Sequence, residues 1–323
     1  MKILTDNKGI ALILVLLIIS IIVAVTLQFN IASRSAVYGA ADLADTFKLM
    51  YIAKSGFFGA EALLIEDDNE FDSLNEDWAQ SALISNISSA FFQSGAFDLR
   101  IEDEAGKLPL NKLVEGIEFN VRTQDMLVRF LGLSDFDLDE QQVRDIVDAI
   151  KDWIDEDDEI TGFGAENAYY QGLDTPYECK NGPLDSVDEL LRIKGITDTL
   201  YYGTEDSPGL ASFITLHGDG RININTAPAL VLRSLDDEIT DDMVAEMEEF
   251  RKDENNDLSD PLWYKNVTGM AAISIDEELV TTASSIFKIT STGYLDTMNL
   301  TACGVVERQR QQKKTKILSW KVD

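Results

Sequence analysis

The sequence predicts an α+β protein, in which a long N-terminal helix and a small antiparallel sheet are separated along the chain by an α-helical insertion. Residues 10–33 carry no charged side chain, and residues 123–252 have mainly helical spacing of apolar side chains. Strand-like alternation of apolar and polar residues occurs at residues 97–102 and returns only after residue 286. Strands of one sheet therefore flank the helical part, which makes that part an insertion.

The apolar run at the N-terminus is long enough to cross a membrane. Residues 10–27 are almost wholly Ile, Leu, Val and Ala, and at about 1.5 Å per residue some 20 helical residues span the ~30 Å hydrocarbon core of a bilayer. The alternatives are a buried helix of a soluble domain and a cleaved secretory signal, but the apolar core of such a signal has only roughly 7–15 residues. A retained anchor is the prediction, and Lys2 and Lys8 put its N-terminal end in the cytoplasm.

Helical spacing continues beyond the membrane segment. Apolar side chains recur between charged ones at Leu43, Phe47, Met50, Tyr51, Phe57 and Leu64. We therefore expect one helix to run from the membrane into the soluble part, with a bend at Gly39, Gly56 or Gly59.

The charge of the chain is strongly one-sided, with 58 Asp and Glu against 27 Lys and Arg and a formal net charge of −31. Such a chain repels phosphate backbones, so nucleic acid is a poor partner, whereas divalent cations suit it. The acid-rich residues 66–77 predict a solvated loop. The C-terminal tail is the basic exception, with Arg308, Arg310, Lys313, Lys314, Lys316 and Lys321.

Turn and capping residues divide the remaining chain. Residues 103–107 predict a turn after the first strand, and residues 108–111 open a helical region that continues through residues 123–154. Within residues 184–196, Ser186 and Glu189 form a capping box for a helix that ends at Gly195.

The C-terminal third contains two short helices and then strands. Asn225 or Thr226 is expected to cap a helix with Pro228 in its first turn, and residues 240–252 form an acidic helix. Turns at residues 296–297 and around Gln311 separate three expected strands, at residues 286–293, 300–306 and 316–322.

An acidic loop is the candidate metal site. Counted from Asp155, acids fall at positions 1, 3, 5 and 12, as Asp155, Asp157, Glu159 and Glu166, which is the spacing of a calcium loop. Position 6 is Ile160 where an EF-hand has glycine, so Gly162 and Gly164 are expected to supply the bend. Crowded carboxylates repel one another unless a cation lies among them, which favours calcium over the alternative of a plain solvated loop.

Other reactive residues are few. Cys179 and Cys303 form either one long-range disulfide or two free thiols, and the sequence leaves both open. The one histidine, His217, lies in a loop-like His-Gly-Asp-Gly segment, and no catalytic motif is present, so we do not expect an enzyme. An anchored hydrolase that uses His217 remains a third hypothesis.

Two segments, residues 190–196 and 222–232, look like fragments of helix-hairpin-helix or SAM-like modules. Such hairpins often bind DNA, but only Arg192 and Lys194 are basic nearby. Small helical bundles are the prediction, and the main alternative is a membrane-anchored helix-hairpin-helix DNA-binding protein of a competence-like system.

The start of the chain resembles the type IV pilin and pseudopilin class: a short basic leader, a glycine, a bare apolar helix and an amphipathic extension. The resemblance implies that a prepilin peptidase cleaves between Gly9 and Ile10 and that Ile10 is then methylated. Most members carry Glu at the fifth mature position, thought to neutralise the terminal ammonium of the subunit ahead. This chain has Leu14 there, which suggests either a subunit with nothing ahead of it or a chain that does not assemble.

A closer resemblance covers nearly the whole chain. Five segments occur in the order found in the minor pseudopilin K family of type II secretion, the general secretion pathway protein K family: residues 106–111, 152–157, 164–170, 181–184 and 222–228. The family implies a pilin-like fold with an inserted α-helical, SAM-like domain and calcium bound in the insertion. Calcium ligands are carried over only for the acidic loop.

The resemblance also implies domain boundaries, as follows: leader peptide 1–9, transmembrane helix 10–30, first part of the pilin-like domain 31–105, inserted SAM-like domain 106–215, second helical SAM-like part 216–284 and C-terminal sheet 285–323.

The expected function is that of a minor pseudopilin at the tip of the type II secretion pseudopilus, which starts and caps its assembly for protein export across the outer membrane. The expected partners are other minor pseudopilins in a hetero-oligomeric tip complex, the major pseudopilin and prepilin peptidase, and no nucleic acid. The expected location is the inner membrane, crossed once, with most of the chain in the periplasm.

Overall fold

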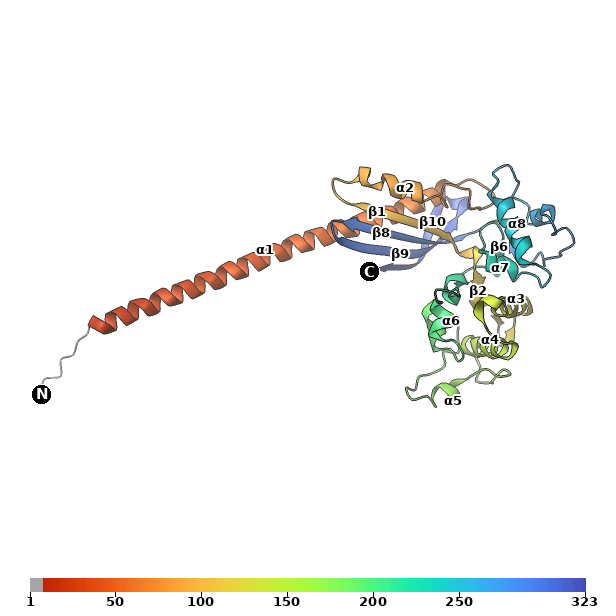
Figure 1. The fold of residues 1–323 in the computed structure, drawn as a ribbon, viewed down its shortest axis with the longest axis horizontal. Helices are drawn as coiled ribbons and strands as arrows, with labels where there is room; N and C mark the ends of the chain where they lie inside the picture. The colour runs from red at the N-terminus through yellow and green to blue at the C-terminus, as the bar shows by residue number, and fades with distance from the viewer. Residues whose placement is uncertain (1–7) are drawn as a thin grey trace.

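A single helix dominates the N-terminal part of the protein (Figure 1). The computed structural model describes residues 8–323, and α1 (Lys8–Glu66) is one continuous helix of 59 residues that passes through Gly39, Gly56 and Gly59 without a break. From Ile10 onward it is long and apolar enough to cross a membrane, and its apolar part is not buried against the rest of the chain. The prediction of one helix from the apolar segment into the folded body is confirmed, whereas Lys2 lies outside the described residues.

The second half of α1 packs on a four-stranded antiparallel sheet with the order β1-β8-β9-β10. The strands are β1 (Ala96–Asp103), β8 (Ile286–Leu295), β9 (Met298–Gln309) and β10 (Lys314–Val322). Alternating burial along β1 and β8 gives each strand one face toward α1, as its sequence pattern predicts. The expected strands and their antiparallel pairing are confirmed.

Two glycines let the helix approach the sheet closely. A Cβ atom on Gly56 would lie 2.9 Å from the Phe97 ring, and one on Gly293 would lie 2.9 Å from the Ala53 nitrogen. The core between helix and sheet is formed by Ile52, Phe57, Ala60, Leu64, Trp78, Phe97, Leu99, Ile101, Phe287, Ile289 and Val306. All of these residues lie outside the chain between β1 and β8.

The insertion between β1 and β8 is mainly helical and has its own core (Figure 1). Its α-helices are α3 (Val121–Leu131), α4 (Glu140–Ile154), α5 (Asn167–Tyr170), α6 (Asp198–Tyr202), α7 (Ala229–Arg233) and α8 (Asp241–Lys252). Its short strands are β2 (Leu108–Pro109), β3 (Val114–Glu115), β4 (Glu118–Phe119), β5 (Ile214–Thr215), β6 (Ile222–Asn223) and β7 (Val280–Thr281). One short helix, α2 (Ala82–Ile87), precedes β1.

Several local predictions need correction. Residues 108–111 begin with strand β2 and enter a 3₁₀ turn only at Leu110, because Leu108 pairs with Ile214. The capping box of Ser186 and Glu189 is confirmed, but its helix is 3₁₀ and ends at Arg192.

The predicted cap of the helix after residue 225 is also wrong. Pro228 occupies the N-cap position of α7, and neither Asn225 nor Thr226 caps that helix. The Asn225 side chain is instead buried, where it accepts a hydrogen bond from Trp263 Nε1 at 2.7 Å and donates to the Leu258 carbonyl.

The prediction of a solvated loop at residues 66–77 is wrong at its centre. Asp72 is fully buried and forms ion pairs with Arg308 and with Arg310, the latter at 2.7 Å. It also accepts a hydrogen bond from the Ser284 backbone nitrogen at 2.6 Å. The basic tail of the chain therefore neutralises the acidic segment, and Ser284 joins this network to the end of the insertion.

Candidate metal centre and N-terminal processing site

Three of the four predicted calcium ligands come together beyond the end of α4. Asp155 is the C-cap residue of α4, and Glu166 is the N-cap residue of α5. One carboxylate oxygen from each of Asp155, Asp157 and Glu166 lies within 4.8 Å of the other two, and we call these three residues the acidic group. Glu159 does not belong to it: the side chain is exposed, and the Glu159 nitrogen donates to Asp157 Oδ1 at 2.7 Å.

The loop around the acidic group is held by hydrogen bonds to carboxylates of α4. The Thr161 nitrogen donates to Asp152 Oδ1 at 3.0 Å, and the Phe163 nitrogen donates to Asp148 Oδ2 at 3.0 Å. Gly162 has φ +50°, and a Cβ on Gly164 would lie 2.8 Å from Asp152 Cγ. The two glycines thus allow the loop to turn back toward the helix, as the sequence predicts.

The acidic group contains buried oxygens that no hydrogen-bond donor satisfies among the described residues. These are Asp155 Oδ1 and both carboxylate oxygens of Glu166, and the two residues are 0% and 2% exposed. Burial, together with the negative charges of the nearby Asp152, Asp155 and Asp158, raises the pKa of Glu166 to about 7. Burial also raises the pKa of Asp155. Unsatisfied, buried carboxylate oxygens are the groups that a hard cation binds.

Asn181 is a further candidate ligand, which the spacing of acids in the loop does not mark. Its Nδ2 donates to the Asp157 carbonyl at 2.7 Å and to Asp158 Oδ1 at 3.1 Å, and its Oδ1 is buried without a hydrogen-bond partner in the described structure. Asn181 has φ +46°, a conformation that asparagine tolerates better than most residues. An amide oxygen is a suitable calcium ligand, so Asn181 joins the candidate set.

Lys151 is the cation nearest to this group. Its Nζ lies 2.5 Å from Asp155 Oδ2 and 2.9 Å from Thr161 Oγ1, one helical turn before Asp155. The ammonium neutralises one carboxylate of the group and leaves Glu166 without a positive partner among the described residues. The donor set is therefore all oxygen, which fits calcium better than a soft metal.

The remaining sequence candidates lie elsewhere. Cys179 and Cys303 are free thiols, and burial raises the pKa of Cys179 to about 12. His217 is half-buried in the loop between β5 and β6. Lys194, the basic residue expected near a DNA backbone, donates instead to the carbonyls of Phe163 and Gly164 at 2.7 and 3.1 Å.

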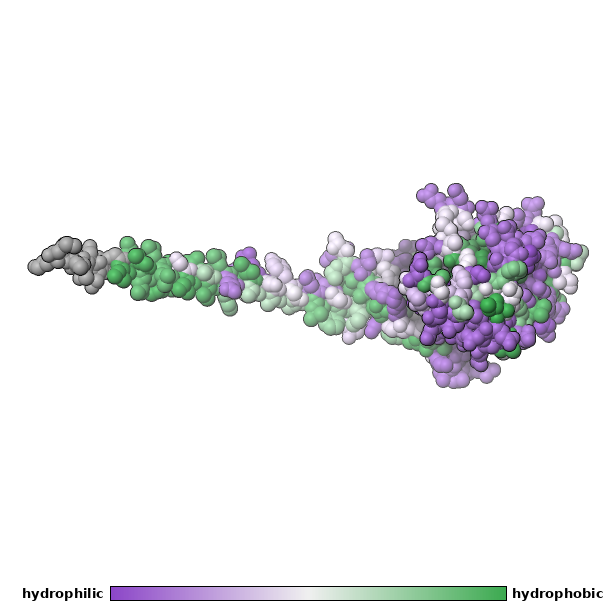
Figure 2. Space-filling model, turned by 90° about the horizontal axis from the view of Figure 1, so that it is seen from below, coloured by the Kyte–Doolittle hydropathy of each residue, from purple (hydrophilic) through white to green (hydrophobic). Residues whose placement is uncertain are grey.

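The predicted processing site lies at the start of α1, which begins at Lys8 and includes Gly9 and Ile10. Ile10 and Leu14 are 64% and 54% exposed. Figure 2 shows the apolar surface continuing along the rod, in contrast to the hydrophilic body.

A long N-terminal helix packed on a small antiparallel sheet, with a helical domain inserted between two of its strands, defines a pilin-like protein with a single candidate membrane anchor in its described part. The fold matches a chain from the crystal structure of the GspK-GspI-GspJ complex of the enterotoxigenic Escherichia coli type 2 secretion system. The TM-score is 0.69 at 16% identity, and the match covers 88% of this chain and 99% of that one.

Sequence comparison agrees. Residues 106–205 match the model of the first domain of type II secretion system protein K. Proteins named type II secretion system protein K are 26% identical in Aeromonas hydrophila, over 60% of each chain, and 28% identical in Pseudomonas aeruginosa, over 71% of this chain and 68% of that protein. The match thus spans 60% of the Aeromonas protein. The family model and the named relatives thus agree that this chain is similar to type II secretion system protein K, and the DNA-binding alternative is not favoured.

Proposed function

We propose that this chain is the minor pseudopilin that starts and caps the pseudopilus of a type II secretion system for protein export across the outer membrane, and that it acts by assembly and not as an enzyme. The solved structure with the same fold is a complex named for GspK, GspI and GspJ. We therefore propose two other minor pseudopilins as partners, in contact with α1, and the major pseudopilin below them. The anchor crosses the inner membrane, and the folded body lies in the periplasm.

The position of the insertion is the observation that supports a tip position most directly. The insertion lies at the end of the molecule opposite the free end of α1 (Figure 1). If pseudopilins pack with their α1 helices roughly parallel, this mass fills the space above the sheet that a following subunit would need. Leu14 agrees with the proposal, because an uncharged side chain offers nothing to the ammonium of a subunit ahead.

Electron microscopy of overproduced pseudopili with a gold-labelled antibody against the insertion tests the tip position. We expect gold at one end of each filament only. Gold along the filament would contradict the proposal. Mass spectrometry of the same material is expected to give a mature chain that begins with methylated Ile10, after cleavage by prepilin peptidase; a chain that still begins at Met1 would contradict processing.

We further propose that Asp155, Asp157, Glu166 and Asn181 bind one calcium ion. Bound calcium supplies the positive charge that the buried Glu166 carboxylate lacks and ties the acidic loop to the segment around Asn181. The buried oxygens without donors support this proposal, whereas a solvated acidic loop would leave its oxygens in water.

Thermal unfolding of the detergent-solubilised chain, with calcium or with a chelator, tests the calcium site. We expect calcium to raise the Tm of the natural chain, because a ligand that binds only the folded state stabilises it by mass action. Glu166→Gln should remove this increase, and Glu159→Gln, the same change in the same loop but outside the acidic group, should keep it. An equal Tm with calcium and chelator, or equal behaviour of the two variants, would contradict the assignment.

A further inference from the structure

The surface of the insertion contains a pocket rich in arginine, which we call the arginine pocket. It has a volume of about 420 Å³ and lies where the ends of α3 and α7 meet the start of α4. This volume falls within the roughly 300–1,000 Å³ of pockets that bind small ligands. Glu140, Val143 and Arg144 of α4 line it, and they share one face of the helix because they are three and four residues apart.

The arginine pocket has a net positive charge in a chain whose net charge is −31. Three arginines line it, namely Arg129, Arg144 and Arg233. Only two carboxylates line it, those of Glu140 and Asp237, and both residues are exposed. The excess of one positive charge matches a ligand that carries a single carboxylate.

Arg129 is held in place without an anionic partner. Its Nε donates to the Ser234 carbonyl at 2.7 Å, and its Nη2 donates to the Leu235 carbonyl at 3.1 Å, just beyond the end of α7. Within residues 8–323 no carboxylate forms an ion pair with Arg129, and its Nη1 has no hydrogen-bond acceptor. Arg129 therefore keeps a nitrogen free to donate to a ligand in the pocket.

The other two arginines of the pocket form only weak ion pairs. Arg144 Nη1 lies 3.5 Å from a Glu140 carboxylate that is 91% exposed. Arg233 Nε lies 3.4 Å from an Asp241 carboxylate that is 96% exposed. Such exposed pairs contribute little to stability, so an incoming carboxylate can replace them.

The rest of the lining is mainly aliphatic. Val128, Leu133 and Leu138 are half-buried, and Val143 is buried, so these side chains form an apolar wall beside the guanidinium groups. An apolar group that packs on this wall leaves water, which favours binding.

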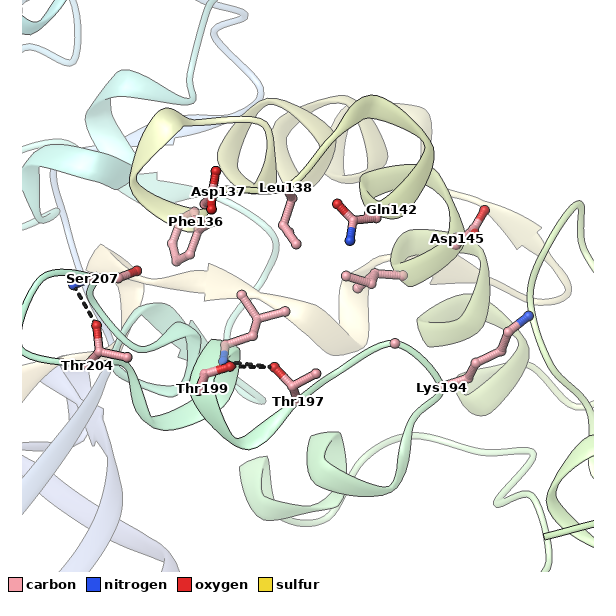
Figure 3. Close-up of a pocket in the computed structure, with 13 residues that line it drawn as sticks. Phe136, Asp137, Leu138, Gln142, Asp145, Lys194, Thr197, Thr199, Thr204 and Ser207 are labelled. Atoms are coloured by element: carbon pink, nitrogen blue, oxygen red, sulfur yellow. Dashed lines mark hydrogen bonds between the residues drawn. The ribbon is translucent and has the colours of Figure 1, made fainter.

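A second pocket, between α4 and residues 194–207, does not offer the same chemistry. There Gln142, from another face of α4, lies across from Thr197 and Thr199 (Figure 3). Asp137 and Asp145 also line this second pocket, and the Lys194 ammonium donates to two carbonyls of the acidic loop. A carboxylate ligand therefore fits the arginine pocket and not its neighbour.

We propose that the arginine pocket binds a carboxylate attached to a branched apolar group. Arginine forms paired, charge-assisted hydrogen bonds with a carboxylate, and the aliphatic wall takes the apolar group. A C-terminal Leu, Ile or Val of a polypeptide has this chemistry, and so does a free branched carboxylic acid. All of the residues that form the pocket belong to the insertion, so the proposal does not depend on the tip position or on calcium.

The test measures binding to the full chain in a neutral detergent. The first probe is a Gly- and Ser-rich peptide with a C-terminal Leu, a free carboxylate and an N-terminal fluorophore, and the second is the same peptide with a C-terminal amide. We expect fluorescence anisotropy to show that the acid binds about tenfold more tightly than the amide, or better, because only the acid can form an ion pair with the arginines. A peptide acid that ends in Gly should bind about tenfold more weakly than the one that ends in Leu, since it has no side chain for the aliphatic wall.

A free acid distinguishes the two sources of this chemistry. Isocaproate carries a branched apolar group on a free carboxylate, and calorimetry compares it with isocaproamide. Binding of the peptide acid but not of isocaproate would assign the pocket to chain ends, and the reverse would assign it to free acids. Binding of neither acid, or equal binding of each acid and its amide, would overturn the proposal.

Variants assign the binding to the arginine pocket. Arg144→Gln and Arg233→Gln are each expected to weaken binding of the preferred acid about threefold or more, and Arg129 is left intact because it holds the end of α7. Arg221→Gln is the control, since Arg221 is a half-exposed arginine of the insertion that pairs with Asp219 and lies outside the pocket. An equal loss in the control variant would show that the acids sense only overall charge, and would overturn the assignment.

Discussion

Arg308, in β9, connects parts of the chain that are far apart in sequence. Its guanidinium forms ion pairs with Asp67 at 2.5 Å and with Asp72, and donates to the Ser284 carbonyl at 2.9 Å. Asp103, at the end of β1, accepts a hydrogen bond from Ser284 Oγ at 2.6 Å. We call these residues the junction network, because they fix the insertion to the sheet at both of its ends.

Removal of the Arg308 charge should therefore lower the free energy of unfolding. Arg308→Met leaves the fully buried Asp72 with only Arg310 as a cationic partner, and breaking a buried pair typically costs about 3–5 kcal/mol. We expect a decrease of that size in the free energy of unfolding, measured with urea. Lys313→Met, which removes an exposed pair with Asp68, should cost less than about 1 kcal/mol. Similar losses in both variants would contradict a special role of the buried pair.

The junction network also predicts a pH dependence of stability. Burial raises the pKa of Asp103 from 3.8 to about 6, although hydrogen bonds from Ser284 and Thr226 lower it in part. The folded chain therefore keeps a proton that the unfolded chain releases between about pH 4 and 6, so this residue makes the fold less stable as pH rises through that window. Relative to Asp103→Asn, which stays neutral, the natural chain should lose stability between about pH 4 and 6.5. The same difference in unfolding free energy at both pH values would contradict this.

For single residues, the sequence predicted the contacts that depend on spacing within one short segment. Asp155, Asp157 and Glu166 could be selected because the acidic loop brings them together by its own turns. Glu159 follows the same spacing, but without glycine at position 160 the loop takes another path and leaves that side chain in solvent. The contact of Asn181 with the acidic loop and the pairing of Asp72 with Arg308 join distant segments, and no local pattern marks these contacts.

At the scale of elements, α1 and the sheet were predicted well because both have long, regular patterns. The short pieces of the insertion were not, since Leu108 pairs as a strand with Ile214, more than a hundred residues away. At Leu108, pairing with a distant strand therefore overrides the local helical pattern.

Two glycines of α1 provide a matched test of how closely the helix must approach the sheet. Gly59 is exposed, and no atom lies within 4 Å of the place that a Cβ would occupy, so Gly59→Ala should stabilise the chain by about 1 kcal/mol through helix propensity. Gly56 faces Phe97 and Ser291, so Gly56→Ala should instead destabilise it by about 1–3 kcal/mol through overpacking. Urea unfolding of both variants checks the opposite signs, and equal signs would contradict the close packing.

At the scale of the whole molecule, the sequence predicted an insertion because strand alternation appears only at the two ends of the soluble part. The register explains how the chain accommodates it: Asp103 of β1 lies opposite Phe287 of β8, so the insertion leaves and re-enters the sheet at neighbouring positions. The insertion has one hydrophobic core, which includes side chains from both predicted helical parts, residues 106–215 and 216–284. The size of this core could not be inferred from the separate short helices.

This register allows the insertion to be removed. Replacing residues 105–285 with Asn-Gly would put Glu104 opposite Ile286 and close β1 and β8 with a two-residue turn. Because the core between α1 and the sheet contains no residue of the insertion, we expect the shortened chain to stay folded, with a protease-resistant sheet and normal cleavage after Gly9. If the insertion excludes a following subunit, the shortened chain should also appear along overproduced pseudopili, as detected by gold labelling of a C-terminal tag. A chain that unfolds would show that the insertion supports the pilin-like part, and labelling confined to one end would assign the tip position to α1 and Leu14 instead.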